Sequence, residues 1–119
     1  MRITEELRGR TKRYASEIVR FYSSLPHQKR EVEVLGHQLL RSGTSVAAHC
    51  REASRARSNA EFISKIDGLL QEADESQLWL ELLHEDCGQA GAAVEFLLSE
   101  TNQLIAIFVT IVSKSRNHP

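Results

Sequence analysis

The one spacing in this chain that could bind a metal is a glutamate followed three residues later by a histidine, at Glu81 and His84. On a helix these two side chains share a face, as they do in the carboxylate-bridged di-metal sites of four-helix bundles. Such a site needs two of these pairs and two further inward glutamates. Because no other histidine here has a glutamate three residues before it, we expect no metal and no cofactor.

His49 and Cys50 are the second pair of reactive side chains. Neighbours on a helix point about 100° apart, so the two suit neither shared metal ligation nor a thiolate–imidazole pair. Cys50 is predicted to be a core thiol, and the role of His49 stays open. No glycine-rich phosphate loop, zinc spacing or nucleophile elbow occurs, so the sequence predicts a protein that is not an enzyme.

Composition indicates one globular domain spanning residues 1–119, with 41% hydrophobic and 26% charged residues. The charged N-terminus does not read as a signal peptide, and the two cysteines form no recognised spacing, so we expect a cytoplasmic protein. The longest apolar run, 104–112, is shorter than the roughly 20 residues that cross a bilayer. No membrane partner is therefore expected.

Apolar residues recur every three or four positions in four segments separated by short breaks. The pattern predicts an all-α, antiparallel up-down four-helix bundle, with helices over about 4–24, 29–53, 58–86 and 90–115. Thr4 is a predicted N-cap, Ser58 and Glu61 form a capping-box pattern, and Gly88 suits a helix end. Glycines inside the second helix, Gly36 and Gly43, indicate either close approach of a neighbour or simple tolerance.

The last helix is apolar on every side from Leu104 onward. A helix that is apolar all round must be covered all round, and a four-helix monomer leaves one flank of each helix in water. We therefore expect a second copy to cover this end, with Phe108, Val109 and Val112 at the subunit interface.

Charges are segregated along the chain, although the net charge is only −1. Residues 67–86 carry seven acidic and no basic residues, whereas the first twenty carry six basic ones: Arg2, Arg8, Arg10, Lys12, Arg13 and Arg20. Acidic and basic segments could pair inside one subunit or meet between subunits, as a ring with one repeated interface requires.

Two surfaces follow from this distribution. Helical spacing places Glu72, Glu75 and Trp79 on one face, which is a candidate subunit interface. A candidate patch for nucleic acid or an acidic partner contains four arginines: Arg41, Arg51, Arg55 and Arg57. The near-neutral chain argues against phosphate binding as its main task, because each neutralised phosphate needs a cation nearby.

The run from Gln38 to Ala48 (QLLRSGTSVAA), followed by Arg51-Glu52-Ala53 and by the stretch from Glu72 to Leu83 (EADESQLWLELL), closely resembles a bacterial four-helix-bundle family. That family is also known from proteins encoded in intervening sequences of large-subunit ribosomal RNA genes. Where the family often has Asn, this chain has His49.

The resemblance implies a cyclic homo-oligomer, typically a pentamer, of uncharacterised role. We therefore expect a non-enzymatic, homo-oligomeric interaction or scaffold protein. The alternative is a protein that associates with RNA or DNA through basic patches, as strongly basic relatives from diversity-generating retroelements do. The modest net charge of this chain departs from those relatives.

Overall fold

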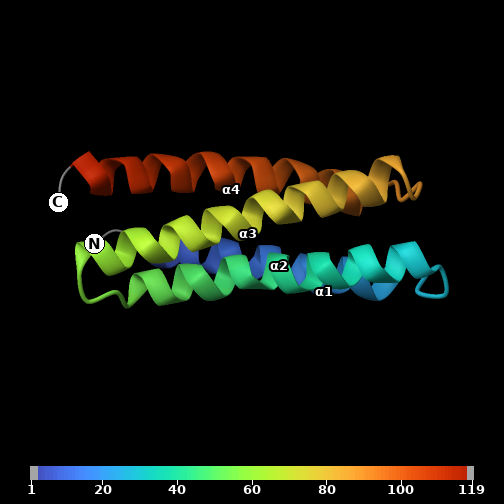
Figure 1. Cartoon of the computed structure of the whole chain (residues 1–119), viewed down its shortest axis with the longest axis horizontal. Helices are drawn as coiled ribbons and strands as arrows, with labels where there is room; N and C mark the ends of the chain where they lie inside the picture. Colours follow the sequence, from blue (N-terminus) through green and yellow to red (C-terminus); the bar gives the residue numbers. More distant parts are fainter. Residues whose placement is uncertain (1–2, 118–119) are drawn as a thin grey trace.

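Four helices run up and down in chain order and form a rod of 48 × 21 × 19 Å (Figure 1). The computed structural model describes residues 3–117, so Arg2 lies outside the described residues. The helices are α1 (Glu5–Ser24), α2 (Arg30–Ser54), α3 (Asn59–Glu85) and α4 (Ala92–Asn117). The predicted all-α, antiparallel up-down bundle is confirmed.

Side chains and glycines end the helices close to the predicted positions. Thr4 Oγ1 accepts a hydrogen bond from the Leu7 N–H (3.0 Å), and Ser58 Oγ accepts one from the Glu61 N–H (3.1 Å). Both predicted N-caps are therefore present. Helix α4 begins two residues later than predicted, because Gly91 has a φ of +116°, which no helix contains.

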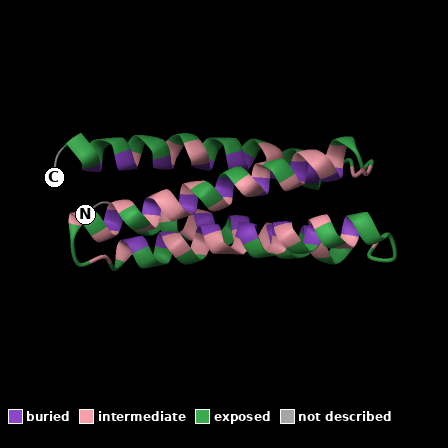
Figure 2. Cartoon of the chain, viewed as in Figure 1, coloured by how far each residue is buried: buried purple, intermediate pink, exposed green. Residues whose placement is uncertain are grey.

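Each helix buries one stripe of side chains and leaves its other sides partly open, as the colours in Figure 2 show. The buried stripes meet in a single core that all four helices share. Its largest fully covered side chains include Phe62 of α3 and Phe108 of α4. Burial of such stripes supplies most of the stability of a helical bundle.

A buried polar layer crosses the middle of this core, with one hydroxyl from each helix. Tyr14 of α1 bonds to Thr101 of α4 (2.7 Å), and Ser42 of α2 bonds to Ser76 of α3 (2.8 Å). All four residues are at most 1% exposed. Thr101 and Ser76 also donate to carbonyls of their own helices, so a helix that slipped along its axis would break both pairs but leave only the buried Tyr14 hydroxyl without a partner. The layer therefore favours this register.

Of the two readings of the α2 glycines, the structure supports close approach. A Cβ at Gly43 would lie 2.8–3.0 Å from three carbons of Ile18, and one at Gly36 would lie 2.8 Å from Leu25 Cδ1. Real Cβ atoms do not come this close, so both glycines let α1 lie directly against α2.

Gly43→Ala should destabilise the protein by about 1–3 kcal/mol, because the β-branched Ile18 is fully buried and cannot move aside. Gly9→Ala is the matched control. Its Cβ would meet only the end of the flexible Arg13 side chain at 3.4 Å, so a gain of about 0.5–1 kcal/mol is expected. Urea denaturation measures both. Equal stability of the two variants would contradict the close packing.

Burial raises the pKa of Tyr14 to about 12 from its ordinary 10.0. The neutral phenol therefore stabilises the fold below pH 10, and this contribution is lost as the pH rises from about 10 to 12. Between pH 8 and 11 the wild type should lose about 1 kcal/mol more stability than Tyr14→Phe, which cannot ionise. Parallel curves of unfolding free energy against pH would show that the phenol is not buried.

Candidate interaction surfaces

One face of the bundle joins α2 to α3 through an ion-pair network, and we call it the α2–α3 face (Arg41, Glu72, Glu75 and Trp79). Arg41 Nη2 donates to Glu75 Oε1 at 3.2 Å, and Arg41 Nη1 lies 3.7 Å from Glu72 Oε1. Trp79 lies one or two turns further along α3, half-buried against the core. The structure thus brings together the three α3 residues that the sequence placed on one face.

Two polar atoms on the α2–α3 face are shielded from water yet lack hydrogen bonds within the described residues. They are Trp79 Nε1 and Glu72 Oε1. Because an unpaired buried donor costs about 1–3 kcal/mol, native proteins rarely leave one unsatisfied. Glu72 Oε1 still pairs with Arg41, so the Trp79 N–H is the donor of this face that has no partner among the described residues.

His49 lies beside this face, where α2 crosses α3. Its ring packs over Gly68, with Cε1 3.5 Å from where a Cβ would lie, and its Nδ1–H donates to Glu52 (3.0 Å). Lys65 Nζ also pairs with Glu52 at 3.5 Å. The His49 hydrogen bond, helped by Lys65, lowers the pKa of Glu52 below its ordinary value. The Glu52 charge is therefore already compensated.

Two of the predicted interface residues are wrong. Phe108 and Val112 are 0% and 3% exposed within a single subunit, so they cannot line a contact between subunits. They belong to the inward stripe of α4, which sequence periodicity alone could not separate from an equally apolar outer side. Val109, by contrast, points outward and is 46% exposed.

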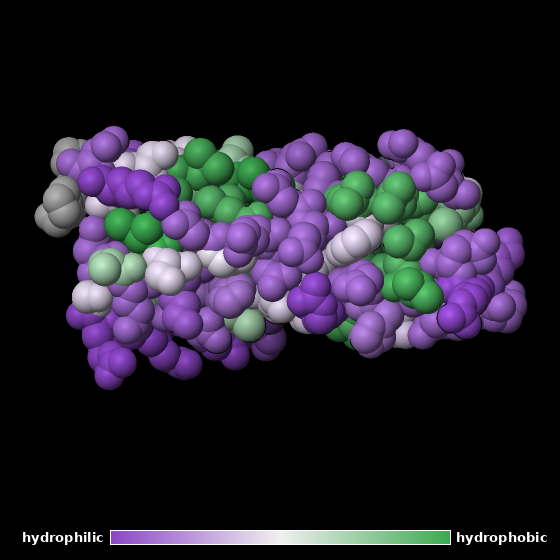
Figure 3. Space-filling view, viewed as in Figure 1, coloured by the Kyte–Doolittle hydropathy of each residue, from purple (hydrophilic) through white to green (hydrophobic). Residues whose placement is uncertain are grey.

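Helix α4 carries two of the five large apolar side chains that are exposed among the described residues, Phe96 and Val109. Only 28% of its most apolar 18-residue window is buried. Figure 3 shows apolar side chains in separate groups on one face, one over α4 near the chain termini and one over α3 and α2 toward the opposite end. By length and composition alone, α4 is also the one helix among residues 3–117 that could span a membrane.

An ion pair fastens α4 to α1. Arg10 donates twice to Glu100, from Nε at 2.8 Å and from Nη2 at 2.9 Å, and the same Nη2 donates to Gln103. This bond raises the pKa of the Arg10 guanidinium further. Two-point pairing fixes the angle between the helices as well as their distance.

The predicted basic patch does not form as a unit of four. Arg41 is engaged on the α2–α3 face, and Arg57 lies 3.8 Å from Glu61. Arg51 and Arg55 are the two members of the patch without an ion pair among the described residues. They lie on the same side, four residues apart.

Helix α1 adds two cations to this pair, and we call the resulting surface the basic groove (Arg8, Lys12, Arg51 and Arg55). A groove of about 520 Å³ between α1 and α2 is lined by Lys12, Ala47, Ala48, Arg51, Glu52 and Arg55. Arg8 lies one turn before Lys12, close enough to act on the Cys50 thiol electrostatically. In the sequence, these four cations can be recognised as two pairs, each with a spacing of four residues. Only the fold shows that the two helices that carry the pairs lie side by side.

His84 and Cys50, which were considered as a possible metal ligand and a possible nucleophile, contribute to the fold instead. His84 Nδ1 donates to the Gln89 carbonyl at 2.7 Å, which ties the end of α3 to the following loop. Burial raises the pKa of the Cys50 thiol, opposite to what a nucleophile needs. Across residues 3–117, no three His, Cys, Asp or Glu side chains gather where they could hold a metal ion.

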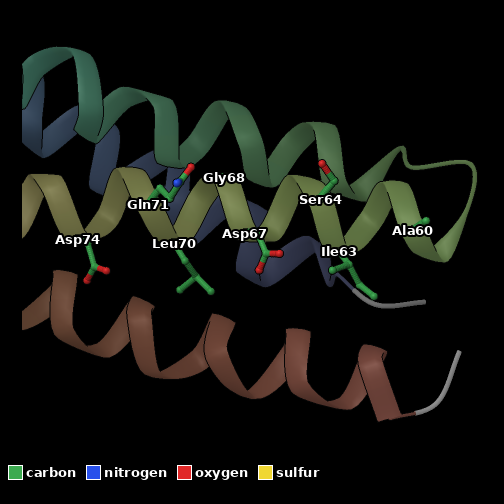
Figure 4. Close-up of a pocket in the computed structure, with 8 residues that line it drawn as sticks. All are labelled: Ala60, Ile63, Ser64, Asp67, Gly68, Leu70, Gln71 and Asp74. Atoms are coloured by element: carbon green, nitrogen blue, oxygen red, sulfur yellow. The ribbon is translucent and has the colours of Figure 1, made fainter.

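The shallow depression on the outer side of α3 is lined by residues of that helix alone (Figure 4). Asp67 and Asp74 point from it toward α4, whereas Gln71 points toward α2. No second element encloses a ligand there, so the depression is part of an open surface. The described chain thus offers surfaces for contact rather than an enclosed site.

Comparison with known proteins agrees with this architecture. No curated protein matches the chain. A crystal structure of a protein of unknown function from the S23 ribosomal protein family of Bacteroides thetaiotaomicron VPI-5482 is 31% identical, with a TM-score of 0.78. The match covers 89% of this chain and 94% of that one. The model of the 23S rRNA-intervening sequence protein family matches residues 6–109, and the chain belongs to that family.

Proposed function

We propose that this protein is a non-enzymatic, cytoplasmic homo-oligomer, a ring of five copies, that acts as an interaction or scaffold protein. The observation that carries the proposal is the incomplete cover of α4, the helix with the strongest apolar character. Its outer side chains include Val109 and Phe96, 46% and 47% exposed. Burying such side chains between copies gains about 25 cal/mol for each Å² removed from water.

A ring with one repeated interface needs two unlike patches on each subunit. The α2–α3 face is acidic and holds two of the three buried polar atoms that lack a hydrogen bond among the described residues, whereas the outer side of α4 is apolar. A copy seated against the α2–α3 face could supply an acceptor to Trp79 Nε1. The number five comes from the family resemblance.

Light scattering on the purified protein tests the assembly. The expected particle has five times the 13.4 kDa mass of one chain. Val109→Glu should reduce the mass toward one chain, because a carboxylate cannot be buried unpaired. Thr110→Glu, also exposed on α4, is the control and should keep the wild-type mass. A 13.4 kDa wild-type particle would falsify the proposal, even if it bound lipid vesicles through α4.

Charge reversal at Glu75→Lys should weaken assembly more than folding. Within one subunit it removes a half-exposed ion pair with Arg41, worth at most about 1 kcal/mol. At an interface it places like charges together, which costs several kcal/mol. Glu85→Lys is the control, because Glu85 makes no ion pair within residues 3–117. If both variants assemble as the wild type does, Glu75 lies outside the interface.

A second function is favoured by the basic groove, whose four cations pair with no carboxylate among residues 3–117. It is the association with RNA or DNA that the sequence left as the alternative. It can coexist with the ring, because the groove lies between α1 and α2, away from the outer side of α4.

A further inference from the structure

We infer that the basic groove binds the phosphodiester backbone of a single nucleic-acid strand without reading its sequence. The inference rests on the second function proposed above and assigns it a surface, a ligand chemistry and a mode of recognition. Arg41 and Arg57, the other two arginines of the patch predicted from the sequence, have no role in this binding.

The cations of the groove are free, whereas many others in the protein are not. Six of the described Lys and Arg side chains are held by carboxylates: Arg10, Arg20, Arg41, Arg57, Lys65 and Arg116. Arg8, Lys12, Arg51 and Arg55 make no ion pair with any described residue, and all four are exposed. No carboxylate among the described residues is therefore paired with these four cations, and an incoming anion can bind them directly.

The one carboxylate that lines the groove does not repel phosphate strongly. Glu52 is bound by His49 and Lys65 on the side facing α3, and this pairing is what lowers its pKa. Its charge is offset before a ligand arrives. The local field of the groove is therefore positive, although the whole chain carries a net charge of −1.

The geometry suits a strand rather than a single ion. Arg8 and Lys12 form one row on α1, and Arg51 forms a second row with Arg55, the C-cap residue of the antiparallel α2. Within each row the Cα atoms are about 6 Å apart along the axis, because each residue rises 1.5 Å. Arginine pairs with phosphate through two parallel N–H bonds. Ala47 and Ala48 of α2 also line the groove, and their small side chains leave it open.

The acidic flank of a second copy is the competing occupant. Glu81 and Glu85 of α3 are unpaired within residues 3–117 and could face the two rows. Protein interfaces, however, have cores depleted of charge and rich in large apolar or aromatic side chains. The groove has only two alanines between its cations. Its composition is that of a phosphate-binding surface, which is polar and strongly positive.

Fluorescence anisotropy with a labelled oligouridylate of about 20 nucleotides tests the assignment. At low salt the wild type should bind. The logarithm of its affinity should fall with the logarithm of salt concentration, with a slope of about 0.7 for each phosphate neutralised on a single strand. Arg51→Ala/Arg55→Ala should weaken binding roughly tenfold or more and reduce the slope by about 1.4. A deoxyribose strand should behave alike, because no contact to the sugar is invoked.

Lys29→Ala/Arg30→Ala is the matched control. It removes two cations, also without ion-pair partners among the described residues, from the opposite end of the same helix. It should leave affinity and slope nearly unchanged. Equal losses from both double variants would mean that only net charge matters, and would overturn the assignment of the groove.

Light scattering on the same samples separates this inference from the ring. If wild type binds neither RNA nor DNA at low salt, the inference is overturned whatever the mass of the particle. If Arg51→Ala/Arg55→Ala instead lowers the mass, the groove is a subunit contact and the inference is again overturned. Loss of binding by this variant with an unchanged mass supports it, whether the particle is a ring or a single chain.

Discussion

The buried polar layer is the constraint on which the rest of the structure depends. Apolar stripes alone allow long helices to slide past one another, because leucine packs against leucine in many registers. One hydroxyl from each helix removes that freedom, since only one register pairs Tyr14 with Thr101 and Ser42 with Ser76. The α2–α3 face and the basic groove each combine residues of two helices, so both exist only in this register.

Once the register is set, each helix hides one stripe and exposes two flanks. Gly43 and Gly36 let α2 lie close to α1, while Arg10 and Glu100 fasten α4 to the other side of α1. Helix α4 has more apolar side chains than one inward stripe can hide. The excess produces an exposed apolar flank, which is the physical reason for proposing assembly.

The basic side chains also fall into two groups, one paired within the subunit and one exposed without ion pairs. Some cations of the described chain serve as internal fasteners, such as Arg41 beside Glu75. Others, among them the four cations of the basic groove, make no ion pair with any described residue. A free cation cluster and an apolar flank on different sides of one rod favour a protein that meets two kinds of partner at once. Assembly and strand binding then need not compete.

The sequence by itself determined the helices, their ends and the up-down order, because periodicity, N-caps and short connections act over a few residues. It also predicted that the last helix has more apolar surface than a single subunit covers. Only the tertiary structure decided that Phe108 faces inward and Val109 outward, since both sides of that helix look alike in sequence. The same holds for Arg41 and Arg51: one is neutralised and the other free, because pairing depends on which helix lies opposite, and that is a property of packing.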